Sequence, residues 1–64
     1  MHIKVTEMVG ESNAGWKSAV QSAVTEASKT MSGIVGVEVV NLTANVENGR
    51  VVEFKANLKV AHKS

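Results

Sequence analysis

The sequence predicts an α+β domain with the element order strand, helix, strand, strand, and three observations predict it. Residues 3–9 alternate for most of their length between apolar and polar side chains, with Glu7 as an exception. Residues 16–31 carry apolar side chains at helical spacing, and from Ile34 onward the period returns to two on both sides of Asn48-Gly49. Sixty-four residues allow one domain, which we expect to span residues 1–64.

The first strand is predicted over residues 3–9 and the helix after a turn at residues 10–15. Ser12 or Asn13 is expected to cap the helix by accepting from its exposed backbone N–H groups. Gly33 is the expected C-cap, and small side chains allow the helix to lie close against a sheet. The apolar stripe of the helix consists of Trp16, Ala19, Val20, Ala23, Val24, Ala27 and Met31.

Two long strands, at about residues 34–47 and 50–62, are predicted to form a hairpin around Asn48-Gly49. This dipeptide accepts the positive φ angles of a two-residue type I′ turn, which pairs residues whose numbers sum to 97. The helix is expected on the more apolar face, which holds Val37, Val39, Asn41, Thr43, Phe54, Ala56, Leu58 and Val60. The opposite face holds Ile34, Gly36, Glu38, Val40, Leu42, Ala44, Val46, Glu53, Lys55, Asn57, Lys59 and Ala61.

Size and composition predict self-association. A chain this short buries only about 60% of its unfolded surface, and it has no Cys to form a disulfide. One helix covers only one face of a three-stranded sheet. Ile34, Val40, Leu42 and Val46 would therefore stay in water on the other face, at a cost comparable to the stability of a small domain. We expect an oligomer that forms through the sheet.

Several classes of function are excluded. A net charge of +1 with scattered Lys residues does not indicate nucleic-acid binding. The longest apolar run, residues 34–40, contains Glu38 and is too short to span a bilayer, so no membrane partner is expected. The N-terminus lacks the apolar core and cleavage site of a signal peptide, and the expected compartment is the cytosol.

No residue pattern indicates an enzyme or a metal site. His2 and His62 have no partners at ligand spacing, and no G-x-S-x-G nucleophile elbow occurs. Nothing places two glutamates side by side, and Glu38 opposite Lys59 is most simply a cross-strand ion pair. Trp16 is either a core or interface anchor or a stacking platform for a ligand. We therefore predict no catalytic residues and no metal ligands.

The ordered set of segments resembles the dodecin family over essentially the whole chain. Residues 4–12 resemble the dodecin strand that ends in Val-Gly-Thr-Ser, and residues 37–40 resemble the Ala-Glu-Val-Val segment. Residues 47–54 look like the Glu-Asp-Gly-Lys-Val-Val-Glu-Tyr hairpin, and residues 58–61 match the Leu-Lys-Val-Ala closing strand. Trp16 falls where many dodecins carry an aromatic residue that opens the helix.

The resemblance implies a strand–helix–strand–strand subunit whose antiparallel sheet wraps around the helix, with twelve subunits in a hollow shell. Dodecins bind flavins such as riboflavin or FMN in pairs near two-fold axes, and they are thought to store, buffer or photoprotect flavin rather than catalyse a reaction. Some bacterial members also bind coenzyme A. The partners implied are thus a small-molecule ligand and further copies of the chain.

The sequence departs from the family at the expected flavin site. The Trp that stacks on the flavin ring in dodecins falls at Gly36, and the family's Gln or Arg on the last strand falls at Lys55. An Arg of some bacterial members falls at Asn45, and the Phe near the end falls at His62. Stacking on an aromatic ring is worth about 0.5–1.5 kcal/mol beyond area burial, so the change at Gly36 weakens the flavin platform.

The resemblance nevertheless places the ligand site at Val35, Gly36, Val37, Lys55, Asn57 and, as a weaker candidate, Asn45. Two explanations for Gly36 stay open. Either a different ligand, or a bulkier part of one, occupies the space of the Trp, or neighbouring subunits close the site. In the second case the protein is a structural shell that does not bind flavin, with ions as candidate ligands on its axes.

Overall fold

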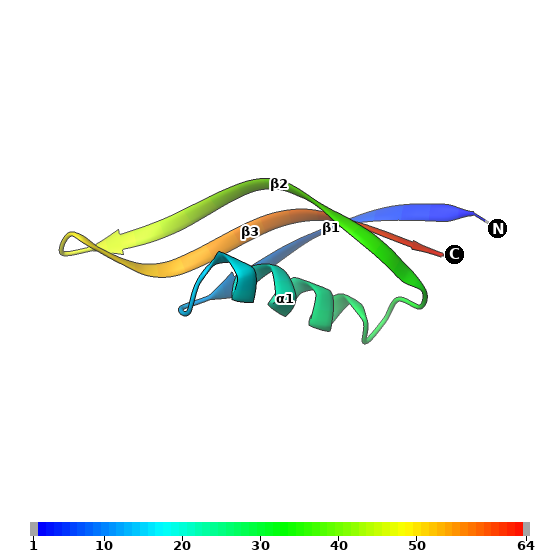
Figure 1. Cartoon of the computed structure of the whole chain (residues 1–64), viewed down its shortest axis with the longest axis horizontal. Helices are drawn as coiled ribbons and strands as arrows, with labels where there is room; N and C mark the ends of the chain where they lie inside the picture. The colour runs from blue at the N-terminus through cyan, green and yellow to red at the C-terminus, as the bar shows by residue number, and fades with distance from the viewer. Residues whose placement is uncertain (1, 64) are drawn as a thin grey trace.

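The computed structural model describes residues 2–63 and confirms the predicted element order. Its elements are β1 (Ile3–Ser12), α1 (Trp16–Ala27), β2 (Ile34–Glu47) and β3 (Arg50–Lys63). The three strands form one antiparallel sheet in the order β1-β3-β2, and α1 lies along one side of it (Figure 1). Met1 and Ser64, the ends of the domain predicted over residues 1–64, lie outside the described residues.

β1 is longer than predicted, because residues 10–12 continue the strand instead of forming a turn. Pairing with β3 runs on to Ser12, which lies opposite Phe54. Gly10 is buried beneath α1, and a Cβ atom at this position would lie 1.9 Å from the Ala19 carbonyl oxygen. Gly10 is thus a close-approach position that brings the strand backbone into contact with the helix.

The helix begins at the predicted residue but without the predicted cap. Gly15 is the N-cap, with φ 154° and ψ 175°, a region that only glycine populates readily. The Ser12 hydroxyl oxygen accepts from the Ala14 backbone N–H at 3.0 Å, and no side chain caps α1. The expectation that Ser12 or Asn13 caps the helix was therefore wrong.

The helix also ends earlier than its apolar stripe predicted. α1 stops at Ala27, and the next residues form turns in which the Thr30 and Met31 N–H groups both donate to the Ala27 carbonyl oxygen, at 3.1 and 2.8 Å. This tightened last turn keeps Met31 packed against the core, which explains its helical spacing. Gly33 has φ 66° but lies beyond these turns, so it is not the C-cap that we predicted.

The hairpin turn agrees with the prediction, whereas the register between its strands agrees only in part. Asn48 and Gly49 both have positive φ, 53° and 75°, as a type I′ turn requires. The predicted pairing, in which residue numbers sum to 97, is observed for residues 46–47 beside the turn and again for residues 36–39. For residues 41–45 of β2 the partner on β3 lies one residue further along, so the sum is 98. The shifts leave three residues without a direct partner in the β2–β3 ladder, and each marks a β-bulge: Val35, Val40 and Val52.

The bulge at Val40 reverses the predicted faces of the central part of β2. Leu42 lies opposite Ala56 and Ala44 opposite Phe54, on the side of the sheet that carries α1. Asn41 and Thr43 lie on the other side. We predicted the reverse, because an uninterrupted alternation contains no extra residue.

The core lies between α1 and the two strands β1 and β3, and α1 does not cover β2. Val37 and Val39, which we predicted beneath the helix, remain 38% and 43% exposed. Ile34 packs against the core on the α1 side, not on the opposite face as predicted. The buried apolar residues are Ala19, Ala23, Ala27, Ala56, Leu58 and Val60.

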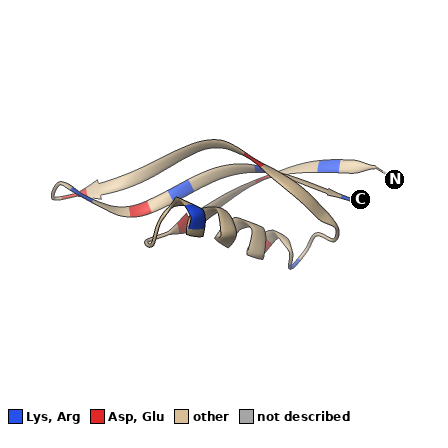
Figure 2. Ribbon diagram, viewed as in Figure 1, with Lys and Arg blue, Asp and Glu red and all other residues tan. Residues whose placement is uncertain are grey.

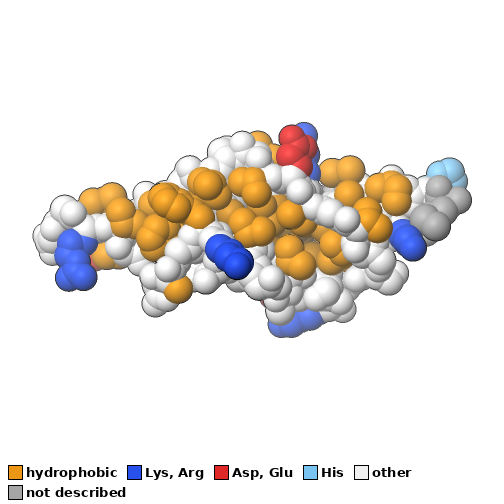
Figure 3. Space-filling model, in the orientation of Figure 1, with side chains coloured by type: hydrophobic (Ala, Val, Ile, Leu, Met, Phe, Trp, Pro, Cys, Tyr) orange, Lys and Arg blue, Asp and Glu red, His pale blue; other side chains and the backbone are white. Residues whose placement is uncertain are grey.

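The subunit is elongated and leaves much apolar surface in water. Its extents are 49 × 19 × 13 Å and its radius of gyration is 12.9 Å, against about 11 Å for a compact chain of this length. Four exposed side chains on the α1 side of β2 form what we name the β2 strip: Val37, Val39, Leu42 and Val46. Figure 3 shows a nearly continuous band of hydrophobic side chains along the visible face. Apolar side chains without cover thus lie on both sides of the sheet: the β2 strip beside the helix, where we did not expect Leu42 and Val46, and Ile3, Val5 and Val9 on the opposite side.

Candidate ligand-binding site

The side of the sheet that faces away from α1, here named the open face, carries most of the predicted site residues. Side chains that lie opposite each other in the ladders share a face, so the three strands define rows across it. The first three rows contain Gly36, Ala61 and Val5, then Glu38, Lys59 and Glu7, then Asn41, Asn57 and Val9. A fourth row contains Thr43, Lys55 and Glu11.

Two shallow hollows lie along this part of the sheet. The first is lined by Val5, Glu7, Glu38, Lys59 and Ala61. Its neighbour Gly36 is open to solvent, since no atom lies within 4 Å of where a Cβ would stand. The second is lined by Glu7, Met8, Val9, Val40, Asn41, Asn57, Leu58 and Lys59. The hollows share Glu7 and Lys59, so they adjoin at the charged middle row.

Polar groups further along the open face are already paired with each other. The Asn45 side-chain amide donates to a Glu53 carboxylate oxygen at 3.1 Å, and the Lys55 ammonium lies 3.9 Å from the same oxygen. The Asn57 amide donates to the Asn41 side-chain oxygen.

Lys59, in contrast, forms no ion pair with any residue of the described range 2–63. Glu38 lies opposite it as predicted, but the expected ion pair does not form. The Lys59 ammonium therefore keeps its full capacity to donate to another group.

The structure brings only some of the predicted site residues together. Gly36, Asn57, Lys55 and Asn45 lie on the open face, whereas Val37 points to the α1 side and Val35 is a bulge residue. Lys55 stands six residues along β3 from Ala61, the partner of Gly36, which corresponds to about 20 Å. One subunit therefore cannot bring Gly36 and Lys55 into contact with the same part of a ligand.

The two aromatic residues of the chain lie away from the open face. Trp16 and Phe54 pack edge-to-face, with ring centroids 4.8 Å apart, and the Trp16 indole N–H donates to the Thr43 carbonyl oxygen at 3.3 Å. This arrangement agrees with an anchor between α1 and the hairpin rather than with a stacking platform on the open face. A ligand on the open face meets no aromatic wall from its own subunit.

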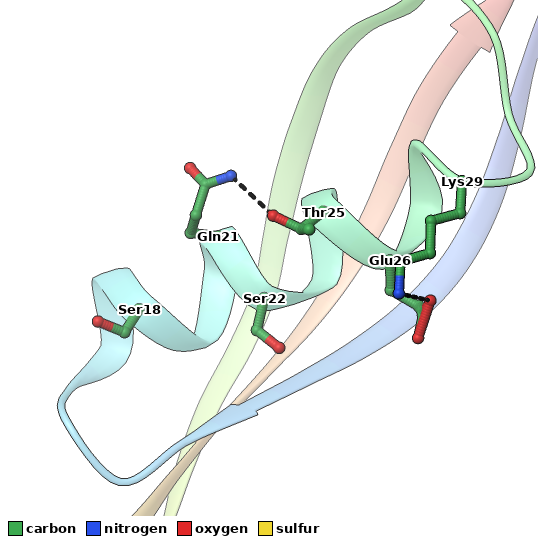
Figure 4. A pocket seen from close by; sticks show the side chains of 6 residues that line it. All are labelled: Ser18, Gln21, Ser22, Thr25, Glu26 and Lys29. Carbon is green, nitrogen blue, oxygen red and sulfur yellow. Dashed lines mark hydrogen bonds and ion pairs between the residues drawn. The ribbon is translucent and has the colours of Figure 1, made fainter.

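A further depression lies on the solvent side of α1 (Figure 4). Its side chains pair with each other: the Gln21 amide donates to the Thr25 hydroxyl at 3.2 Å, and the Lys29 ammonium lies 3.3 Å from a Glu26 carboxylate oxygen. These groups are exposed, and the surface has the polar character of the outer face of an amphipathic helix.

The charge distribution and metal-ligating groups add no second site. Figure 2 shows acidic and basic residues spread over the ribbon without a run of one sign. Among residues 2–63, no group of three or more His, Cys, Asp or Glu side chains stands close enough to hold a metal ion. No helix in the same range is long and apolar enough to cross a membrane.

Comparison with known proteins decides the family. The sequence model of the family described as Dodecin matches residues 3–64 of this chain. The chain belongs to the dodecin family. Dodecins are small flavin-binding proteins that store their ligand and form oligomers.

Solved dodecin structures share the whole fold. The dodecin from Streptomyces coelicolor is 35% identical, with a TM-score of 0.94, over 98% of this chain and 90% of its own. The dodecin from Streptomyces davaonensis is 25% identical, with a TM-score of 0.94, over 98% of this chain and 93% of its own. A Thermus thermophilus protein is 28% identical, with the same score and the same two coverages as the S. davaonensis dodecin. A comparison with curated protein sequences found no match.

The middle row of the open face was missed as a site by sequence reasoning. The predicted hairpin correctly placed Glu38 opposite Lys59. Glu7 was not predicted to join this row, because nothing in the sequence fixed how β1 pairs with β3. The signal that was present is the one polar interruption of the apolar face of the first strand, which is Glu7.

Proposed function

We propose that this dodecin is the subunit of a hollow dodecamer that binds and stores riboflavin or FMN and catalyses no reaction. The observation that carries the proposal is the match of residues 3–64 to the dodecin family. The exposed β2 strip supports assembly, because burying a large aliphatic side chain contributes about 1.5–3 kcal/mol. The cytosol is the proposed compartment.

The open face fits a flavin in part. A fused planar ring can lie on the floor formed by Gly36 and Ala61, since neither residue projects a bulky side chain. Lys59 offers hydrogen-bond donors and Glu38 offers acceptors beside that floor. No side chain of the same subunit can stack on the ring there, so we expect weaker binding than in a dodecin with Trp at this position.

The predicted site residues can act together only across a contact between copies. We propose that Val35 and Gly36 of one copy face Lys55, Asn57 and Asn45 of another copy around the ligand. In that arrangement Val37, on the α1 side, contacts the neighbouring copy rather than the flavin.

Titration of the purified protein with riboflavin and with FMN tests the proposal. We expect quenching of flavin fluorescence at micromolar protein, and a yellow colour if flavin is retained during purification. The Gly36→Trp variant should bind flavin roughly tenfold more tightly, because it restores a stacking surface. Sedimentation velocity should give the mass of twelve chains.

The same experiment separates two alternatives. A protein that assembles but quenches no flavin, even as Gly36→Trp, supports a structural shell and contradicts flavin storage. Addition of coenzyme A during the titration tests the second ligand that the resemblance implies. A monomer at micromolar concentration contradicts the dodecamer and the storage role together.

A further inference from the structure

A row of three charged side chains crosses the open face beside Gly36. In the two ladders Lys59 lies opposite Glu7 on one side and opposite Glu38 on the other. All three side chains are exposed and line the first hollow together with Val5 and Ala61. The row therefore places one cation between two carboxylates next to an apolar floor.

Two lysines of this face, Lys55 and Lys59, differ in how they are engaged. The Lys55 ammonium lies 3.9 Å from the Glu53 carboxylate, which also accepts from Asn45. Lys59 has no ion-pair partner among residues 2–63, although it stands between two glutamates in register. Of the two, Lys59 has the ammonium that is free to donate to a ligand.

Position on the sheet also separates the two lysines. Lys59 and Glu38 lie two residues along their strands from Ala61 and Gly36, which is about 7 Å. Lys55 lies six residues from Ala61, about 20 Å away. A fused ring resting on the Gly36–Ala61 floor reaches the row of Lys59 with its edge, and it does not reach Lys55 of the same subunit.

The chemistry of the row specifies the edge that it recognises. An ammonium only donates hydrogen bonds and a carboxylate only accepts them. The matching ligand edge therefore presents a carbonyl oxygen next to an N–H group, which is the pattern of a cyclic imide. Charge-assisted hydrogen bonds of this kind are about twice as strong as neutral ones.

We propose that Lys59 and Glu38 hold the imide edge of the bound ring, with Lys59 donating to a ring carbonyl and Glu38 accepting from the ring N–H. The inference rests on the proposed flavin-binding function and deepens it. It assigns specificity to this row rather than to Lys55, the position at which the resemblance puts the contact with the polar edge of the flavin. Glu7, on the far side of Lys59, balances its charge.

The test compares riboflavin with riboflavin methylated at the imide nitrogen, using wild-type protein and single variants. In wild-type protein the methyl group should weaken binding at least tenfold, because it removes the donor and places carbon against a carboxylate. The Glu38→Gln and Lys59→Met variants should each bind riboflavin about tenfold more weakly. In Glu38→Gln the methyl group should cost much less, since the two changes remove the same contact.

Two matched variants serve as controls. Lys29→Met makes the same change in an exposed lysine just after α1, and Glu26→Gln makes the same change in a carboxylate on the outer side of α1. Both should bind riboflavin within about twofold of wild type. Sedimentation velocity on every variant verifies that assembly is intact, and the methylated ligand keeps the test valid in unaltered protein.

The outcomes separate this inference from the proposed function. If wild-type protein binds riboflavin and its methylated form equally well, or if Lys55→Met weakens binding and Lys59→Met does not, the assignment to Lys59 and Glu38 is overturned while flavin storage stands. If wild-type protein binds no riboflavin, the proposed function fails and this inference fails with it.

Discussion

The two halves of the sheet use different side chains and are stabilised in different ways. Under α1, β1 and β3 meet the helix through small residues, and the largest fully buried side chains among residues 2–63 are Leu58 and Val60. On β2, which α1 does not cover, the large aliphatic side chains of the β2 strip remain exposed. The helix-covered half is thus held within the subunit, whereas we expect the other half to depend on contacts with further copies.

The largest expected effect concerns the close contact between α1 and β1. Gly10→Ala places a methyl group 1.9 Å from the Ala19 carbonyl oxygen, so backbone must move to accept it. We expect the free energy of unfolding to fall by about 3 kcal/mol. Urea unfolding at a fixed protein concentration measures this, because the stability of an oligomer depends on that concentration.

Gly36→Ala is the matched control for this substitution. It makes the same change at a β2 position where no atom lies within 4 Å of the new methyl group. We expect a change of less than about 1 kcal/mol, and in the stabilising direction, because alanine loses less conformational freedom than glycine. Equal losses in the two variants would contradict the division of the sheet into a tightly packed half and an open half.

The next effect concerns assembly through the β2 strip. Leu42→Asp puts a carboxylate in the centre of that strip, where we expect a neighbouring copy to bury it. The burial energy of a leucine side chain is lost and an unpaired charge is placed in the contact, which together should raise the concentration needed for assembly at least a hundredfold. Sedimentation velocity across a dilution series measures this shift.

Ser22→Asp, on the exposed outer face of α1, introduces the same charge away from the strip and should leave assembly unchanged. If Leu42→Asp sediments like wild-type protein at every concentration, the β2 strip is not part of a contact between copies. The comparison of the two halves then needs another surface to complete the second one.

The same division marks how far the fold was predictable from the sequence. Element order, the turn at Asn48-Gly49 and the first residue of the helix follow from local periodicity and turn chemistry, and they were predicted correctly. The extra residue at Val40 was not predicted. A β-bulge keeps the apolar–polar alternation on each side of it, and it only exchanges the two faces beyond the extra residue, so the sequence pattern does not reveal it. That single residue exchanged the predicted faces of Leu42 and Asn41.

The candidate site shows the same limit. Glu38 and Lys59 lie on neighbouring strands of one hairpin, and their predicted pairing is observed because the bulges at Val52 and Val40, on opposite strands, cancel in register. Glu7 lies far away in the chain, and its place beside Lys59 depends on how β1 pairs with β3, which no local signal determines. Likewise Gly10 reads as a turn residue until the helix above it is known.

The smallest predicted effect contrasts one part-buried and one exposed hydrogen bond. His62, which is 9% exposed, is bonded through its Nε2 atom to the Thr6 hydroxyl at 2.9 Å, between β3 and β1. Thr6→Val keeps the side-chain shape but removes this partner, and we expect a loss of about 1–2 kcal/mol in urea unfolding. Thr25→Val removes the partner of Gln21 on the solvent side of α1 and should change stability by less than about 0.5 kcal/mol.

A serine at position 6 separates the hydrogen bond from packing. Thr6→Ser retains the hydroxyl and loses one methyl group, so it should recover part of the stability that Thr6→Val loses if the bond to His62 is what matters. If Thr6→Val and Thr25→Val instead cost the same, water reaches His62 at the end of β3. The core of the helix-covered half would then be more accessible to water near His62 than the burial of its apolar residues indicates.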